Sequence, residues 1–208
     1  MQETRISDKL ATFRRLYHKK IEDAIILEEK IFGSAHSEQE YYDNCKRGLQ
    51  IEIRYADERK DGEVISFPVA FIVLFNRVDQ TDIIIDGIPN HERKITRHIW
   101  LCGVLPEFRN RGFMKGLFYM CFSGDPNMIV PRCADDRNYE SSDIIFVHTY
   151  PEYYKDMFVL LQKYGFVEEK EIVGKYKNQG RCVRYVTTFE KIRKIMNAST
   201  SLCLAKLN

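Results

Sequence analysis

The sequence lacks the features that mark membrane-spanning and secreted proteins. No run of residues reaches the ~18 uncharged apolar positions that a bilayer-spanning helix needs, and residues 1–9 are polar where a secretory leader would be apolar. The six cysteines form no CxxC pair, and no cysteine–histidine cluster has the spacing of zinc ligands. We therefore expect reduced thiols, no metal, no membrane partner and a cytoplasmic protein, with a nuclear one as the alternative.

An excess of charge of one sign is also missing. Lysine and arginine together number 32, and aspartate and glutamate number 30, which leaves a net charge of +2. A chain so close to neutral argues against nucleic acid as a partner. Because hydrophobic residues make up 44% and aromatic residues 12% of the chain, we expect a single folded domain over residues 1–208. Its core is expected at 8–190, with a loosely ordered tail at 191–208.

The spacing of apolar residues predicts an α/β fold. A period of 3.6 residues predicts a first helix that begins at Ser7 or Asp8 and ends at Gly33, and Ser37 with Glu40 forms a capping box for a second, short helix. The remaining segments are strands over 49–56, 64–75, 99–104, 144–149, 166–172 and 182–189, and helices over 112–122 and 151–164. The strand–helix–strand order in the middle implies one parallel pair within a mixed, mostly antiparallel sheet of about six to seven strands, flanked by about four helices.

Two details concern individual strands. In residues 49–56, apolar side chains alternate with Gln50, Glu52 and Arg54, which predicts a strand with one buried and one exposed face. Pro68 cannot donate a hydrogen bond to a neighbouring strand, so we expect a bulge or local break beside it.

The stretch from 99 to 117 carries the clearest chemical signal. A strand ends at Pro106, a short turn with Arg109 and Arg111 follows, and Gly112 opens a helix. The free backbone N–H groups and the positive end of the dipole make such a helix start a site for phosphate oxygens, and the glycine lets a ligand approach the backbone. A solvated surface turn is the competing interpretation.

The spacing Val104-x-Pro106-x-x-Arg109-x-x-Gly112-x-Met114 resembles the acyl-CoA signature of the GNAT superfamily. The resemblance implies the GNAT fold with a splayed parallel strand pair, acetyl-CoA as cosubstrate and transfer of an acetyl group to a primary amine. It further implies that backbone groups of the preceding strand pair with the pantetheine arm of CoA and that the turn holds its pyrophosphate. The implied CoA-binding residues are Cys102 and Val104 on the strand, and Arg109, Asn110, Arg111, Gly112, Phe113 and Met114 in the turn and helix start.

Two observations bear on that resemblance. Met114 stands where the family usually has glycine or alanine, but its N–H is retained, so the anion site is expected to survive. The segment Leu160–Phe166, in which Tyr164 and Gly165 precede Phe166, resembles the end of a second helix that is typical of the family. The likeness covers roughly residues 17–190.

The resemblance also suggests catalytic groups. His98 stands at the family's general-base position, six residues before Val104, and an imidazole accepts protons near neutral pH. His148 on the neighbouring strand is the second candidate, and an ordinary strand-edge histidine is the alternative for His98. Trp100, two residues further on, is expected on the same face as His98.

The usual acid of the family is replaced. Leu161 occupies the position of the family's tyrosine and cannot donate a proton. The same helix offers Tyr153, Tyr154 and Tyr164, of which Tyr154 falls where the family often has an asparagine that contacts the cofactor. We therefore predict Tyr154 as a catalytic residue, with packing as the alternative for all three tyrosines.

Three functions remain open from the sequence. An N-acetyltransferase is the first, and a GNAT-like module that binds CoA or a partner protein without catalysis is the second, supported by Leu161. The third is a nucleic-acid-binding domain that uses the basic residues between Lys175 and Lys194. Residues 76–97 and 125–142 are expected to wall the acceptor site. The sequence indicates neither the acceptor amine nor the oligomeric state.

Overall fold

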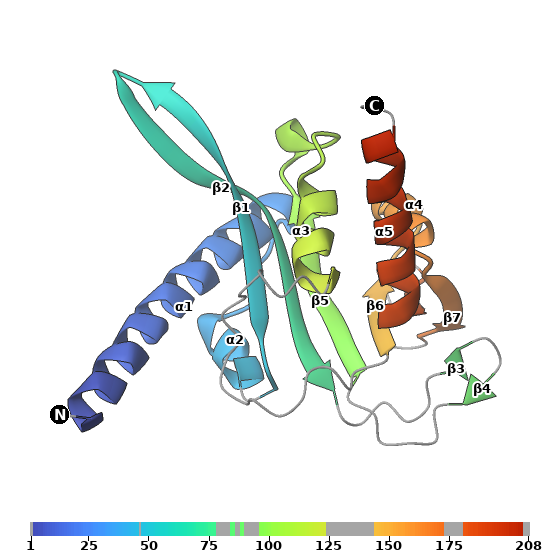
Figure 1. Ribbon diagram of the computed structural model, residues 1–208, viewed down its shortest axis with the longest axis horizontal. Coiled ribbons are helices and arrows are strands. Elements are labelled where there is room, and N and C mark those ends of the chain that lie inside the picture. Colours follow the sequence, from blue (N-terminus) through green and yellow to red (C-terminus); the bar gives the residue numbers. More distant parts are fainter. Residues whose placement is uncertain are drawn as a thin grey trace.

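A six-stranded mixed sheet forms the centre of the molecule (Figure 1). The computed structural model describes residues 2–45, 47–77, 84–85, 88–89, 96–123, 144–172 and 181–205, without the side chains of 2–16, 85, 88–89 and 199–205. The strands are β1 (Gln50–Lys60), β2 (Glu63–Arg77), β3 (Ile84–Ile85), β4 (Ile88–Pro89), β5 (Thr96–Val104), β6 (Ile144–Thr149), β7 (Val167–Glu171) and β8 (Val183–Thr188). Their order in the main sheet is β1-β2-β5-β6-β8-β7, and β3 and β4 form a separate pair.

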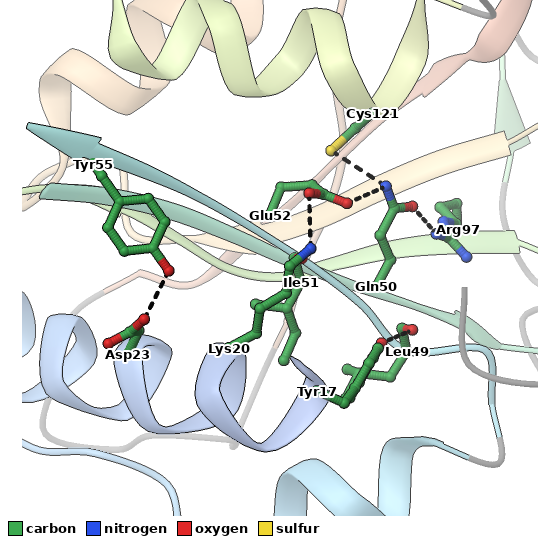
Figure 2. Close-up of polar contacts among 10 residues, drawn as sticks. All are labelled: Tyr17, Lys20, Asp23, Leu49, Gln50, Ile51, Glu52, Tyr55, Arg97 and Cys121. Carbon is green, nitrogen blue, oxygen red and sulfur yellow. Dashed lines mark hydrogen bonds and ion pairs between the residues drawn. The ribbon is translucent and has the colours of Figure 1, made fainter. Parts of the chain in front are cut away.

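The strand directions confirm the predicted sheet. Within the main sheet β5 and β6 are parallel, and every other neighbouring pair is antiparallel. The α-helices of the described residues are α1 (Gln2–Phe32), α2 (Glu38–Cys45), α3 (Phe113–Phe122), α4 (Lys155–Lys163) and α5 (Phe189–Ala205). Helices α1 and α3 lie on opposite faces of β1 (Figure 2). Among these described helices, none is long and apolar enough to cross a bilayer.

Two predicted boundaries of the first helices are confirmed, and one is wrong. Gly33 ends α1 with φ +78°, and its N–H donates to Glu29 O at 2.9 Å, as predicted. The capping box is also confirmed, because the backbone N–H of Ser37 donates to Glu40 Oε2 at 2.8 Å. The predicted start at Ser7 or Asp8 is wrong, since α1 already begins at Gln2.

The bulge predicted at Pro68 is present. Pairing between β1 and β2 shifts register between Arg54 and Tyr55, where Arg54 faces Ala70 and Tyr55 faces Pro68. The shift leaves Val69 without an opposite residue on β1. Because regular pairing is interrupted there, the two strands do not need the hydrogen bond that Pro68 cannot donate. Past this point the β1–β2 hairpin extends beyond the rest of the sheet (Figure 1).

Strand β1 is buried on both faces at its start, which corrects the prediction of one exposed face. Gln50 and Glu52 are each only 4% exposed. They lie between β1 and α3, whereas Ile51 faces the opposite side, so the polar half of the alternation is buried too. The alternating residues at the start of β1 therefore face two buried layers, one toward α1 and one toward α3, rather than the core and the solvent.

A polar network satisfies these buried groups (Figure 2). The Gln50 amide donates to Glu52 Oε1 at 3.3 Å, and its oxygen accepts a hydrogen bond from the Arg97 guanidinium. Lys20 of α1 reaches around the edge of β1, donates to Ile51 O at 2.9 Å and lies 3.2 Å from Glu52 Oε2. Helix α1 thereby occupies backbone acceptors on the sheet edge that a further strand would otherwise use.

The C-terminal segment corrects another expectation. Residues 191–205 continue α5 rather than forming a loosely ordered tail. Ile192 and Met196, four residues apart on one face of α5, are at most 4% exposed. Burial of this face outweighs the polar, Ser/Thr-rich composition that suggested disorder. Helix α4 also begins at Lys155 rather than at Pro151, which lies in a turn.

The network around Gln50 gives a test of stability. We expect Gln50→Leu to lower the free energy of unfolding by about 1–3 kcal/mol, because it removes the acceptor to which the buried Arg97 Nη2 donates. Urea denaturation followed by circular dichroism measures this value. The exposed Lys194→Gln change, which removes an ion pair with Glu190, is the matched control and should leave the midpoint unchanged. An unchanged midpoint for Gln50→Leu would show that the network carries no stability.

Candidate functional site

The site begins where β5 and β6 stop pairing. The last parallel partners are Ile99 and Val147, yet β5 continues to Val104. Pairing with β2 shifts between Val73 and Leu74, which leaves Trp100 as an extra residue on β5. Such a bulge bends a strand and increases its twist. The two parallel strands therefore separate beyond Ile99.

A cavity of about 650 Å³ lies over this separated part of β5. Cys102, Gly103 and Val104 line it from β5, with Met157 from α4 and Ile31 from α1. The Cys102 thiol lies 3.9 Å from the sulfur of Met157. A Cβ on Gly103 would come within 2.9 Å of the Ile31 side chain, so a larger residue here would force Ile31 to shift. Side chains from two helices thus enclose a stretch of strand that β6 does not cover.

The turn before α3 supplies backbone donors at one end of the cavity. Asn110 has φ +61° and Gly112 has φ +81°, so two left-handed residues curl the chain between the 3₁₀ turn Pro106–Phe108 and α3. No side chain caps α3 at Gly112. A helix start without a side-chain cap presents N–H groups to an anion, and the positive end of the helix dipole faces the same point.

The charges around the cavity fit an anionic ligand. Four basic side chains line it against two acidic ones: Arg109, Lys115, Lys155 and Lys163 against Glu152 and Asp156. Such an excess of basic groups beside an uncapped helix start favours a ligand with several phosphate charges. Among the described residues, no group of His, Cys, Asp or Glu side chains is arranged to hold a metal ion.

Seven of the eight predicted CoA-binding residues line this cavity: Cys102, Val104, Arg109, Asn110, Gly112, Phe113 and Met114. The Arg111 guanidinium instead lies over the Phe108 ring, 5.0 Å from its centroid. Arg109 turns back toward its own strand, with Nε 3.5 Å from Val104 O. Met114, the departure from the family pattern, is 9% exposed and packs into the core while leaving the helix start open.

The thiol of Cys102 is held in its protonated form. Burial raises the pKa of the Cys102 thiol to about 12, so it stays protonated. A thiol in this state is a poor nucleophile. The raised pKa therefore disfavours a covalent intermediate on Cys102.

The structure brings the two candidate bases together. The ring centroids of His98 and His148 are 5.3 Å apart, on adjacent parallel strands close to the last paired residues. His98 is 6% exposed and stacks on Phe146 at 4.4 Å. It does not line the cavity. Phe75 contacts both His98 and Trp100, in agreement with the prediction that these two share a face.

The tyrosines fall into two groups. Tyr153 and Tyr154 line the cavity, and the Tyr154 ring packs edge-on against Phe32 of α1 at 5.9 Å. Tyr164 is 4% exposed and stacks on Phe118 in the core, so it is a packing residue. Leu161, at the position of the family's acid, is fully buried.

Some cavity residues were missed by sequence reasoning. Ile31 and Phe32 close the cavity from the end of α1, and Met157 and Lys155 enter from α4. Ile31 and Phe32 fall within the first predicted helix, and nothing in their spacing points to a ligand. The predicted acceptor walls at 76–97 and 125–142 lie largely outside the described residues.

The basic residues that suggested nucleic-acid binding are partly neutralised. Arg181 pairs with Glu168 and Glu171, and Arg184 is buried against Glu169. Lys175 and Lys177 lie outside the described residues. The described arginines therefore offer less free charge to a phosphate backbone than the sequence alone implies.

Comparison with known proteins identifies the fold. No protein-family model and no curated protein sequence matches the chain. Among solved structures, NAA60 of Arabidopsis thaliana in complex with acetyl-CoA superposes with a TM-score of 0.57 at 16% identity, over 83% of this chain and 94% of that one. The NatC complex bound to Gag peptide and CoA gives 0.54 at 17% identity, over 81% and 90%. Naa50 of Arabidopsis thaliana with the bisubstrate analogue CoA-Ac-MVNAL gives 0.51 at 16% identity, over 81% and 92%.

These structures are N-acetyltransferases of the GNAT superfamily, and the chain has the GNAT fold. The sequence motif in residues 99–114 resembles the acyl-CoA signature of this superfamily, and the fold of the chain agrees with that resemblance. The separated parallel strands and the glycine turn lie where the sequence motif predicted them.

Gly112 offers a test of the anion site with opposite effects on stability and binding. An added Cβ there has no atom within 4 Å, and asparagine and aspartate tolerate left-handed φ better than other non-glycine residues. We expect Gly112→Asp to bind CoA at least about tenfold more weakly than Gly112→Asn, because its carboxylate repels phosphate. Without ligand, the aspartate variant should be at least as stable, since both residues are good N-caps.

Calorimetric titration with CoA and thermal denaturation without it give the two values. Equal CoA affinity in Gly112→Asp and Gly112→Asn would show that no phosphate lies at the start of α3.

Proposed function

We propose that this protein transfers an acetyl group from acetyl-CoA to a primary amine. The observation that carries the proposal is that the part of β5 not paired with β6 and the uncapped start of α3 line one cavity. An extended amide chain such as pantetheine can pair with backbone groups of Cys102 and Val104. The pyrophosphate would then meet the amides from Asn110 to Met114, and the basic lining would offset the remaining phosphate charge.

Acetyl transfer in this proposal is direct. The neutral amine attacks the thioester carbonyl carbon, the carbon–sulfur bond breaks, and the sulfur leaves as a thiolate that takes up a proton. The protonated Cys102 thiol supports a direct route over one through an acetyl-cysteine. The residues of the chain then have three tasks, namely to orient the thioester, accept the ammonium proton and protonate the leaving sulfur.

His98 is the proposed proton acceptor, with His148 beside it as the second candidate. Their proximity near the last paired residues of β5 and β6 supports a role for this pair of rings at the inner end of the gap. Tyr154 is the proposed proton donor to sulfur, because it lines the cavity whereas Tyr164 is packed in the core. Arg111 is proposed to contribute through its backbone, since its side chain lies on Phe108.

A module that binds CoA without catalysis is the second candidate function. The fully buried Leu161 favours it, because the usual tyrosine donor is missing at that place. Purified protein incubated with acetyl-CoA and a panel of primary amines separates the two functions by release of the free CoA thiol. Amine-dependent release supports acetyl transfer. Normal CoA binding with no release above the uncatalysed rate would support the binding module.

Substitutions of His98 and of His148 distinguish the two candidate bases. We expect His98→Ala to lower kcat by about 10²–10⁴-fold at neutral pH, which is the usual loss when a positioned base is removed. The loss should shrink as pH rises, because free amine becomes common as the pH approaches ~10.4. A wild-type pH–rate profile in His98→Ala, together with a large loss in His148→Ala, would assign the base to His148 instead.

The tyrosine pair offers a matched comparison on adjacent residues. We expect Tyr154→Phe to lower kcat by about tenfold or more, because the donor to the leaving sulfur is lost while the ring contact with Phe32 remains. Tyr153→Phe is the control, since this side chain is 64% exposed and should lose little. Steady-state kinetics at saturating acetyl-CoA measures both. Equal rates in the two variants would mean that water protonates the sulfur.

A further inference from the structure

Strand β1 lies at one edge of the main sheet, and α1 covers only the first part of that edge. The carbonyl groups of Leu49 and Ile51 point away from β2, because they accept hydrogen bonds from Tyr17 and Lys20 of α1. Alternate residues of a strand present their backbone groups to the same side, and the bulge adds its extra residue to β2, so this alternation continues along β1. The backbone groups that point outward further along β1 belong to Ile53, Tyr55, Asp57 and Arg59.

These four residues form an open edge, which we call the outer edge of β1. In the part of the chain that the structure describes, no group bonds to their outward backbone N–H and C=O groups. Past the bulge the β1–β2 hairpin projects beyond the rest of the sheet as a two-stranded ribbon (Figure 1). Its exposed side chains include Val64 and Ile65, which keep 60% and 47% of their surface accessible. A two-stranded ribbon is only marginally stable by itself, and a further strand on its open edge would stabilise it.

The side chains along this edge alternate between the two faces of the sheet. Arg54 lies on the α3 face, since a Cβ added to Gly116 would be 3.1 Å from its Nη2. Tyr55 lies on the α1 face, where its hydroxyl donates to Asp23 Oδ2 at 2.7 Å (Figure 2). The α3 face continues with Ala56, Glu58 and Lys60, and the α1 face with Asp57 and Arg59. Residues 57–60 are thus two acidic residues followed by two basic ones.

The order of these charges restricts how two copies of the edge can pair. Outward residues must lie opposite outward residues, so the two-fold axis of an antiparallel pair passes through one residue of β1. An axis at any charged residue places that side chain opposite its own copy, which is unfavourable. An axis at Tyr55 places Glu52 opposite Glu58. An axis at Ile53 needs the Ile51 carbonyl, which α1 already occupies.

We propose that two copies of this protein associate through the outer edge of β1, antiparallel, with Ala56 on the two-fold axis. In this register Arg54 lies opposite Glu58 of the partner subunit, and Tyr55 lies opposite Asp57 of the partner subunit. No like charges meet, and the small Ala56 side chains lie at the axis. Charged side chains on an edge disfavour most incoming strands, so this order of signs selects a second copy over an unrelated strand.

The association leaves the proposed acyl-CoA cavity open. Strand β2 separates β1 from β5, which lines the cavity. The inference therefore goes beyond the proposed acetyl transfer and does not depend on it. Because one strand from each copy forms the contact, the interface lies below ~1,200 Å², the range of weak and transient complexes.

Sedimentation velocity of the full chain at increasing concentration measures the association. We expect the 24.6 kDa monomer at the lowest concentrations and a reversible dimer as the concentration rises. Wild-type protein that remains monomeric up to ~1 mM would overturn the proposal, because a dimer of that affinity contributes little.

Two proline variants form a matched pair on the same hairpin. Asp57 and Ser66 lie opposite each other and their side chains hydrogen-bond, so both changes remove that bond. The N–H of Asp57 points out of the outer edge of β1, whereas that of Ser66 points out of the other side of the hairpin. Asp57→Pro should therefore weaken the dimer at least about tenfold, and Ser66→Pro should leave it unchanged. Equal dimerisation of the two folded variants would overturn the proposal.

A charge variant decides the matter if circular dichroism shows that Asp57→Pro does not fold. Glu58→Arg places an arginine opposite Arg54 at two symmetric positions and should weaken the dimer at least about tenfold. Glu63→Arg, the same change of charge on β2, is the control and should associate as wild type. Neither variant should change the rate of acetyl transfer. Wild-type association of Glu58→Arg would contradict the proposed pairing.

A cysteine at the axis tests the register. Residues at Ala56 would form a pair without hydrogen bonds to each other, with Cα atoms ~4.5 Å apart, which a disulfide can bridge. Mild oxidation should therefore link Ala56→Cys into a covalent dimer on a non-reducing gel. Glu58→Cys, two residues away, and the wild-type chain with its own six cysteines are the controls and should remain largely unlinked. Equal linkage of Ala56→Cys and Glu58→Cys would overturn the axis at Ala56.

Discussion

The site depends on one constraint, which is that β5 and β6 stop pairing after Ile99 and Val147. A strand that loses its neighbour is left with backbone groups that need other partners. The bulge at Trp100 bends β5 away, and Met157 of α4 packs against Cys102 so that the strands stay apart. The packing of Ile31 on Gly103 covers the other side of β5. The same separation creates the cavity and fixes the direction in which an extended ligand would lie along β5.

Charge is distributed unevenly about this gap. The cavity side carries the uncapped start of α3 and a majority of basic side chains, which suits a cosubstrate with several phosphates. The connection between α1 and α2 carries buried Glu28 and its partner His36 against Trp100. Polar groups elsewhere in the core, such as Gln50 and Arg97, are paired with one another.

Local patterns in the sequence account for much of the fold and for the cavity. Alternation and turn residues located the strands, and the Pro106–Gly112 turn lies where its spacing predicted. Burial of both faces of β1 was not predictable, because alternation cannot tell which helix covers the polar face. Helix α5 was missed because its Ser/Thr-rich composition outweighed the spacing of Ile192 and Met196. Contacts between distant segments, such as Gln50 with Arg97, depend on strand order and leave no local signal.

Hydrogen exchange of the β5 amides, with and without CoA, tests the central claim most directly. If the part of β5 that is not paired with β6 receives the pantetheine arm, CoA should slow exchange in residues 100–104 and at the start of α3. Residues 96–99, already paired with β6, should exchange as before. Protection that appears elsewhere, with residues 100–104 and 112–115 unchanged at saturating CoA, would contradict the account.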